Sequence, residues 1–161
     1  MNRGLRVEKC VLRRGLLLLA VLGLAGALWA ANPFVGTWKM NAAKSKTSYQ
    51  LKGSFTTKVE GQDNGIKAVE DLVFANGNAV HRRWAAKYDG KDYPVEGDPT
   101  IDAISLKRTN PNTINYVVKK SGKQLASGKW IVFKDDKTST DTGSAKVENQ
   151  VFTYNLFLEK Q

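Results

Sequence analysis

The stretch Asn110-Pro-Asn-Thr-Ile-Asn-Tyr-Val-Val-Lys-Lys-Ser-Gly122 contains the pattern that decides the fold. A turn signal stands at each end of it, Asn-Pro-Asn at the start and Ser-Gly at the finish. Between the turns, Ile114, Tyr116 and Val118 occupy every second position. Because successive side chains of a strand point to opposite faces, this alternation predicts a β-strand with these three residues on one face.

The same arrangement of turns and alternating segments recurs along the chain. Most turn signals lie about 12–14 residues apart, and the segments between them are rich in β-branched and aromatic residues, which favour strands. The further signals are Asp63-Asn64-Gly65, Asn76-Gly77, Asp89-Gly90, Gly97-Asp98-Pro99, Asp135-Asp136 and Gly143-Ser144. Only residues 41–50 are expected to form one short turn or helix. We therefore predict an all-β protein, an antiparallel up-and-down meander of eight to ten strands.

Closure of this meander into a barrel is the arrangement we expect, because a closed barrel leaves no exposed strand edges. A β-sandwich of two packed sheets is the alternative. The chain has 161 residues, which suits one domain with a short extension. Its single Cys excludes a disulfide framework, and its single His excludes a metal site built on two imidazoles. We therefore expect no cofactor and no metal.

The extension is the N-terminal segment, residues 1–30, which we interpret as a secretory signal peptide. Five basic residues precede an uncharged apolar run, Leu16–Trp29, and the run ends in Ala30-Ala31. We expect cleavage after Ala30, with an uncleaved membrane anchor as the alternative. Five of the 25 basic residues and one of the 15 acidic residues lie in residues 1–30, so residues 31–161 keep 20 basic and 14 acidic residues and no Cys. The expected location is secreted or periplasmic, with no integral membrane span after cleavage.

Two sequence stretches resemble a known family. Phe34-Val-Gly-Thr-Trp38 carries a Gly-x-Trp motif similar to the first strand of lipocalins and the wider calycin families. Asn32–Asn41 and Trp84–Val95 also resemble a group of small secreted bacterial lipocalin-like proteins. The resemblance implies a lipocalin-like barrel over residues 31–161, with Trp38 closing its floor and Lys160 packed across the indole ring.

Catalysis has little support in the sequence, and we expect no catalytic residue and no enzyme activity. His81 alternates with Arg82 and Trp84, so it faces outward if Trp84 faces the core. The adjacent carboxylates Glu70 and Asp71 point to opposite faces of a strand and cannot readily share a substrate. The Gly-rich turns lack a phosphate-binding motif.

Binding inside the barrel is the function we expect instead. Alternation predicts an inward set of apolar and aromatic residues, with Arg82 as the only charged member. A buried guanidinium needs a carboxylate, water or an anionic ligand. We therefore predict a pocket for a small hydrophobic or aromatic anionic ligand, whose anion lies against Arg82. The predicted ligand-binding residues are Trp38, Arg82, Trp84, Tyr88, Tyr116, Trp130 and Tyr154.

A barrel filled completely by its own side chains is the alternative to a pocket. In that case the basic exterior, on which Lys58, Lys67, Lys107 and Lys129 are scattered, would bind anionic envelope components. We expect no nucleic acid partner, and the sequence favours no particular oligomeric state.

Overall fold

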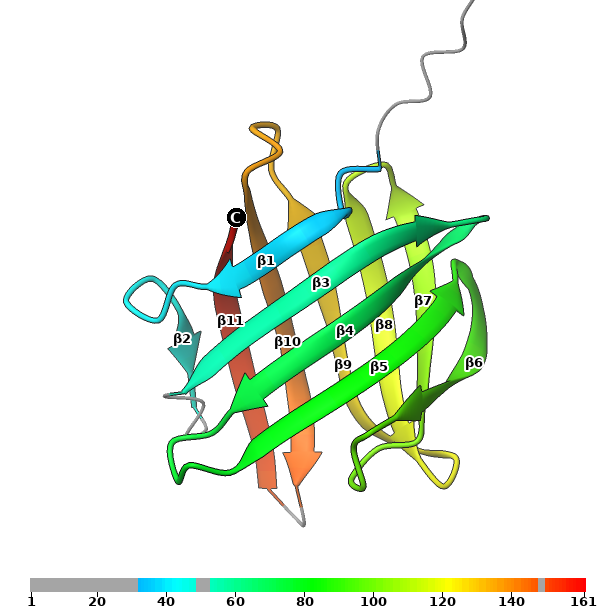
Figure 1. Ribbon diagram of the computed structural model, residues 1–161. Helices are drawn as coiled ribbons and strands as arrows, with labels where there is room; N and C mark the ends of the chain where they lie inside the picture. The colour runs from blue at the N-terminus through cyan, green and yellow to red at the C-terminus, as the bar shows by residue number, and fades with distance from the viewer. Residues whose placement is uncertain (1–31, 49–52, 148–149) are drawn as a thin grey trace, which may run out of the picture. The chain divides into compact units, whose positions relative to one another are not determined.

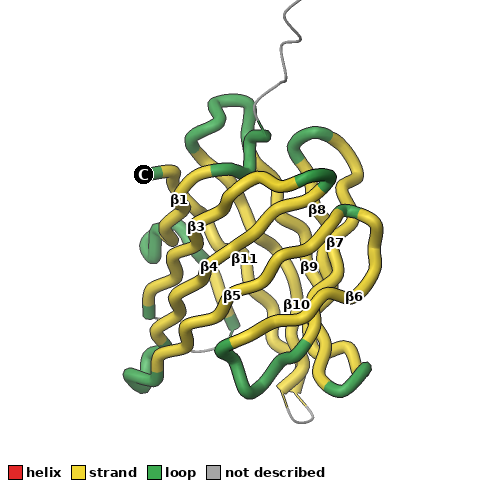
Figure 2. Tube along the Cα trace, turned by 45° about the vertical axis from the view of Figure 1, so that its right-hand side comes forward, coloured by secondary structure: helices red, strands yellow, loops and turns green. Residues whose placement is uncertain are grey.

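The computed structural model describes residues 32–48, 53–147 and 150–161, and every regular element in these ranges is a β-strand (Figures 1 and 2). The signal peptide predicted over residues 1–30 lies outside the described residues. The strands are β1 (Gly36–Met40), β2 (Lys46–Thr47), β3 (Ser54–Gln62), β4 (Gly65–Val73), β5 (Ala79–Lys87), β6 (Asp89–Glu96), β7 (Ala103–Asn110), β8 (Thr113–Lys120), β9 (Lys123–Val132), β10 (Thr138–Val147) and β11 (Gln150–Lys160).

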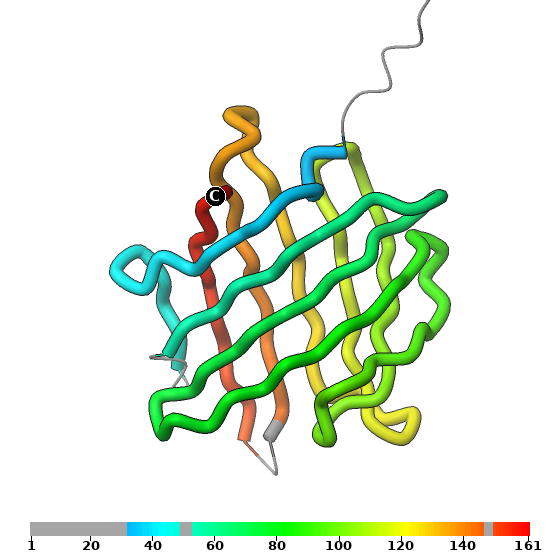
Figure 3. Tube along the Cα trace, in the orientation of Figure 1, coloured from blue at the N-terminus to red at the C-terminus, as the bar shows by residue number. Residues whose placement is uncertain are grey.

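Tight turns join the strands at most of the predicted positions. Asn64, Ser121 and Asp136 have positive φ angles of 52°, 49° and 53°. Gly77 and Gly97 have φ of 83° and 86°, which glycine adopts without steric cost. Each of these residues reverses the chain between neighbouring antiparallel strands. The predicted meander is therefore confirmed (Figure 3).

The meander closes into a barrel of ten strands. Strands β3 to β11 pair in chain order, and β1 pairs with β3 on one side and β11 on the other. At the closure, Trp38 of β1 stands opposite Thr57 of β3 and Lys160 of β11. The two-residue strand β2 pairs with β11, beyond the end of β1. The closed barrel confirms the predicted fold and excludes the β-sandwich.

Aromatic side chains fill one end of the barrel, which we call the floor and define by Phe34, Trp38 and Trp130. The Trp130 ring contacts the rings of Phe34 and Trp38 edge to face, at centroid distances of 5.0 and 5.7 Å. The Trp38 Nε1–H donates to the Phe34 carbonyl at 2.8 Å, and the Trp130 Nε1–H donates to Ser139 Oγ at 2.9 Å. The polar atoms of both indoles are thus satisfied inside the core.

Lys160 covers the floor as the family resemblance implied. Its Nζ lies 4.9 Å from the centroid of the Trp38 ring and donates to the Pro33 carbonyl at 3.2 Å. The glycine of the Gly-x-Trp motif is required there, because Gly36 has φ of 134° and a Cβ would stand 2.9 Å from Lys160 Cε. The motif therefore lets Lys160 cross the backbone of β1 and reach the indole.

The structure differs from the expected turns in β10 and decides between a turn and a helix after β1. Gly143-Ser144 was expected to be a turn, and this prediction is wrong because both residues lie within β10. In the region of residues 41–50, the described part forms a turn without a helix, in which the Asn41 carbonyl accepts from the N–H groups of Lys44 and Ser45. Among the described residues, no helix has the length and apolar character needed to span a membrane.

Candidate functional site: an apolar cavity with two polar clusters

The interior of the barrel holds a cavity of about 660 Å³. Most of its wall is apolar, because the inward positions of the strands carry aliphatic side chains. These include Ile66, Leu72, Ile104, Leu106, Val118 and Leu125. The volume lies within the range of about 300–1,000 Å³ that is usual for small-molecule sites. The alternative of a filled barrel is therefore wrong, since the side chains do not meet across the interior.

Five of the seven predicted ligand-binding residues line this cavity: Arg82, Trp84, Tyr116, Trp130 and Tyr154. The other two lie elsewhere. Trp38 is fully buried in the floor, where its ring packs against Trp130. Tyr88 directly follows β5, and there its hydroxyl accepts from Asn32 and the Arg108 guanidinium lies 5.4 Å from its ring. Alternation gives the face of a residue but not its height along the barrel, so it could not separate these two residues from those that line the cavity.

The first polar cluster of the cavity is built around Arg82. Its side chain faces inward, as predicted, and its Nε–H donates to the Glu70 carboxylate. Its Nη1 lies 3.4 Å from Oδ2 of Asp98, a residue of the β6–β7 loop. Burial alone would lower the pKa of Arg82, but these two carboxylates outweigh that effect and raise it. The guanidinium charge is thus already paired within the protein.

Cross-strand register brings this cluster together. Glu70 of β4 stands opposite Arg82 of β5 and, on its other side, opposite Thr57 of β3. The next pair along the same two strands, Asp71 and His81, lies on the outer face and forms its own contact of 2.7 Å. His81 is therefore outside the cavity, as predicted, and Glu70 and Asp71 do point to opposite faces.

The second polar cluster consists of Tyr116, Asp141 and Tyr154. The Tyr116 hydroxyl donates to Asp141 Oδ1 at 2.6 Å and lies 2.5 Å from the Tyr154 hydroxyl. Burial raises the pKa of Asp141 to about 7, and the negative charge of Glu70 adds to this effect. The hydrogen bond from Tyr116 and the positive charge of Arg82 act in the opposite direction. The two clusters are thus close enough to influence each other electrostatically.

Two glycines make room for the tyrosines. Four residues form one row across strands β8 to β11. Tyr116 of β8 stands opposite Gly128 of β9, and Gly143 of β10 stands opposite Tyr154 of β11. The two glycines pair with each other in the middle of the row. A Cβ at Gly128 would overlap the Tyr116 hydroxyl, and a Cβ at Gly143 would overlap that of Tyr154. Both phenol rings therefore lie over the backbone of a glycine, which has no side chain, and this arrangement places their hydroxyls together.

Two buried polar atoms in this part of the barrel have no hydrogen-bond partner among the residues that the structure describes. They are the Thr57 Oγ1, in a residue that is only 3% exposed, and the Trp84 Nε1. Both residues line the cavity. Buried polar groups are normally hydrogen-bonded, so these two atoms are exceptions within the cavity wall.

Four residues in or beside the cavity were not predicted as site residues from the sequence: Thr57, Glu70, Asp98 and Asp141. Glu70 alternates with Ile66 and Ala68, so its inward position could have been read from β4. Asp141 was not found because a turn was expected at Gly143, which interrupted the strand pattern on that side. Asp98 lies in a loop, where alternation gives no direction.

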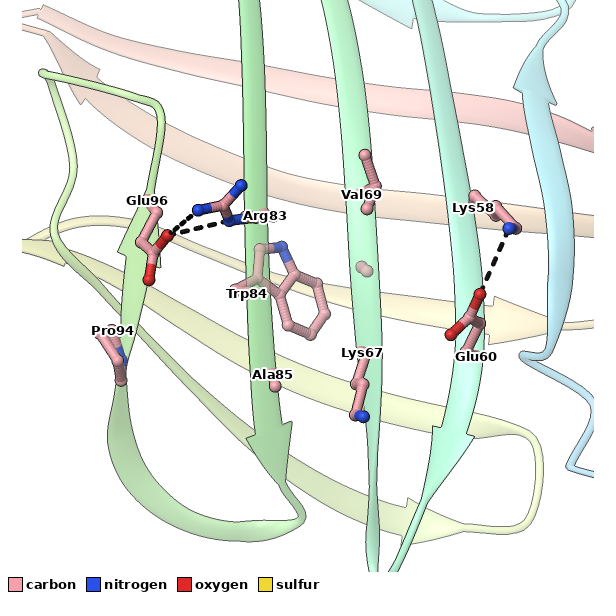
Figure 4. Close-up of a pocket in the computed structure, with 10 residues that line it drawn as sticks. Lys58, Glu60, Lys67, Val69, Arg83, Trp84, Ala85, Pro94 and Glu96 are labelled. Atoms are coloured by element: carbon pink, nitrogen blue, oxygen red, sulfur yellow. Dashed lines mark hydrogen bonds and ion pairs between the residues drawn. The ribbon is translucent and has the colours of Figure 1, made fainter.

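A shallower groove of about 380 Å³ lies on the outer face of β3 to β6 (Figure 4). Ion pairs flank it on both sides, Arg83 with Glu96 at 2.6 Å and Lys58 with Glu60 at 3.2 Å. The Trp84 ring lies between β5 and β4 and borders both this groove and the cavity. Within the described ranges, no three His, Cys, Asp or Glu side chains are grouped to hold a metal ion.

Comparison with known proteins gives a structural likeness and no sequence match. No family model matches the chain, and no curated protein matches it. Among solved structures, the chain is similar to zebrafish ileal bile acid-binding protein, crystallised in complex with cholic acid, with a TM-score of 0.50 and 10% sequence identity. The alignment covers 80% of this chain and 99% of that one. At this identity the likeness concerns the fold alone, a closed antiparallel β-barrel.

Proposed function

We propose that this chain binds a small, predominantly apolar molecule inside its barrel. The observation that carries the proposal is the cavity of about 660 Å³ with aliphatic walls and a few buried polar groups. The structural neighbour, a barrel of similar fold crystallised with cholic acid, is consistent with this use of the fold. Binding is favoured over catalysis because His81 lies on the exposed outer face, away from the cavity.

We further propose that the protein works after export, as a secreted or periplasmic binding protein of bacterial type. The support is the sequence of residues 1–30, a basic start followed by a short apolar run and small residues. Residues 31–161 contain no Cys, so the core and the barrel closure stabilise the exported domain without disulfides.

The anionic ligand group expected from Arg82 would compete with the carboxylates that already pair with this residue. Glu70 and Asp98 already accept the charge of Arg82, so an anion would have to replace a carboxylate or share the guanidinium with both. Removing a group from a buried ion pair leaves an uncompensated charge, which is costly. Arg82 therefore supports an organising role in the cavity wall better than a role as an open anion receptor.

Tryptophan fluorescence tests the proposed function and the role of Arg82 together. Trp84 and Trp130 line the cavity, so a neutral apolar probe such as N-phenyl-1-naphthylamine should quench or shift their emission as it fills the site. In an Arg82→Gln variant, the affinity for alkyl carboxylates relative to that for this probe should stay nearly constant, whereas an anion receptor would lose at least about tenfold in this ratio. Arg83→Gln, on the outer face, is the matched control. Failure of neutral and charged apolar molecules alike to change the emission at millimolar concentration would refute the proposed function.

A further inference from the structure

Acidic side chains outnumber basic ones around the cavity. Among the described residues that line the cavity or pair directly with its lining, Glu70, Asp98 and Asp141 are acidic, and Arg82 is the only buried base. Lys146 also borders the cavity, but its side chain is exposed near the end of β10 and is screened by solvent. With Asp141 ionised, the interior therefore carries two more negative charges than positive ones.

Neighbouring groups are also suited to a positive ligand group. The Thr57 Oγ1, which has no hydrogen-bond partner among the described residues, stands beside Glu70 in the sheet register and is a further oxygen acceptor next to that carboxylate. Aromatic rings of Trp84, Tyr116 and Tyr154 line the same space. The faces of such rings attract cations, most strongly where water is excluded.

We propose that the ligand of this cavity carries a basic nitrogen, bound in its protonated form against the carboxylates of Asp141 and Glu70, with its apolar part along the aliphatic walls. The proposal rests on the proposed function and specifies the chemical class of its ligand, an apolar amine. A cation at this place would compensate the excess negative charge, and its N–H groups would donate to carboxylate and hydroxyl oxygens that the protein leaves available.

The titration of Asp141 supports this placement. Its pKa of about 7 reflects burial and the charge of Glu70, while Tyr116 from β8 and Arg82 from β5 favour the ionised form. Tyr154, from β11, completes the groups around it, and burial together with the Asp141 charge raises the pKa of this phenol, so it stays neutral. A bound cation favours the ionised carboxylate, so an amine should bind more tightly as the pH rises through 7, up to the pH at which the amine itself loses its proton.

A series of three ligands with one chain length separates this proposal from the proposed function. Dodecylamine, 1-dodecanol and dodecanoate are each used to displace N-phenyl-1-naphthylamine from the purified protein at pH 8.5. The amine should bind at least about tenfold more tightly than dodecanoate, with the alcohol in between. If the alcohol binds and the amine has no advantage over dodecanoate, the basic nitrogen is refuted and the apolar site stands. If the probe and all three ligands fail to bind, both proposals are refuted.

An Asp141→Asn variant tests the carboxylate itself, since the amide oxygen still accepts the hydrogen bond from Tyr116. The ratio of the affinity for dodecylamine to the affinity for 1-dodecanol, measured in the same variant, should fall about tenfold. Asp71→Asn, which changes an exposed carboxylate on the outer face, should leave the preference intact. The wild-type protein gives a second measurement that needs no variant, because its preference for the amine should decrease between pH 8.5 and pH 5.5. A preference that persists unchanged in Asp141→Asn, or at pH 5.5, would overturn the proposal.

Discussion

Asp141 is placed where its charge weakens the fold. Its pKa of about 7 in the barrel lies well above the ordinary value of 3.8, so the folded protein holds the proton more tightly than the unfolded chain. The stabilisation that this protonation provides is fully present below about pH 4 and is lost as the pH rises to about 7. A residue that destabilises the protein at neutral pH is more readily explained by a ligand than by packing.

We predict that Asp141→Asn stabilises the barrel, and more so at high pH. The variant lacks the ionisable group, so it avoids the cost of a buried charge. Its gain in free energy of unfolding should be about 2–3 kcal/mol larger at pH 8.5 than at pH 5, as chemical denaturation at the two pH values can measure. An equal gain at both pH values would show that Asp141 titrates normally.

Trp38 and Lys160 contribute very different amounts to the floor. The Trp38 side chain is completely buried and packs against Trp130. We expect Trp38→Ala to cost about 3–5 kcal/mol in unfolding free energy, as the loss of a large core aromatic does. Lys160→Ala should cost about 0.5–2 kcal/mol, the range of a cation over an indole ring. Equal small losses would contradict the account of the floor.

At the scale of the strands, sequence periodicity predicted which face most residues occupy but not which residues meet across strands. His81 and Arg82 were assigned to the correct faces by alternation alone. The partners of Arg82 depend on the register between β4 and β5 and on the β6–β7 loop, and neither is contained in a periodic pattern. The same limit explains Gly143: glycine usually marks a turn, but here it makes space for a tyrosine of the neighbouring strand.

The row from Tyr116 to Tyr154 predicts a strict requirement for glycine in β10. Gly143→Ala would bring a Cβ into the Tyr154 hydroxyl and within 2.5 Å of the Ser127 carbonyl oxygen. We expect a loss of about 1–3 kcal/mol in unfolding free energy, the usual cost of overpacking, together with displacement of the phenol from Asp141. Ser144→Ala, at the next position and on the opposite face of β10, should change stability by less than about 0.5 kcal/mol. Comparable effects of the two substitutions would argue against the proposed packing.

For the whole molecule, regular turn spacing and alternation were sufficient to predict a closed antiparallel barrel, because each hairpin must bury one face and the edges must pair. They were not sufficient to predict a cavity. Whether inward side chains meet in the middle depends on their volumes and heights around the barrel, which only the three-dimensional arrangement defines. The predicted inward aromatics therefore divide between a packed floor and an open site.

The interpretation of residues 1–30 as a signal peptide predicts where the mature chain begins. We expect the intact mass of the protein from the secreted or periplasmic fraction to correspond to a chain that begins at Ala31, or within one or two residues of it. A species that retains Met1 and fractionates with the membrane would favour the uncleaved anchor instead.

The claim that the cavity is a ligand site is tested most directly by native mass spectrometry of the protein with 1-dodecanol, in the wild type and in a variant with a blocked cavity. Ala126 and Ala145 face each other across β9 and β10 and line the cavity, so replacing both by Trp should occupy part of it. Ser144→Trp, on the opposite face of β10, is the control. We predict one bound alcohol per chain in the wild type and in the control, and none in the blocked variant. Binding that is equal in all three proteins, or absent from all three, would contradict the account.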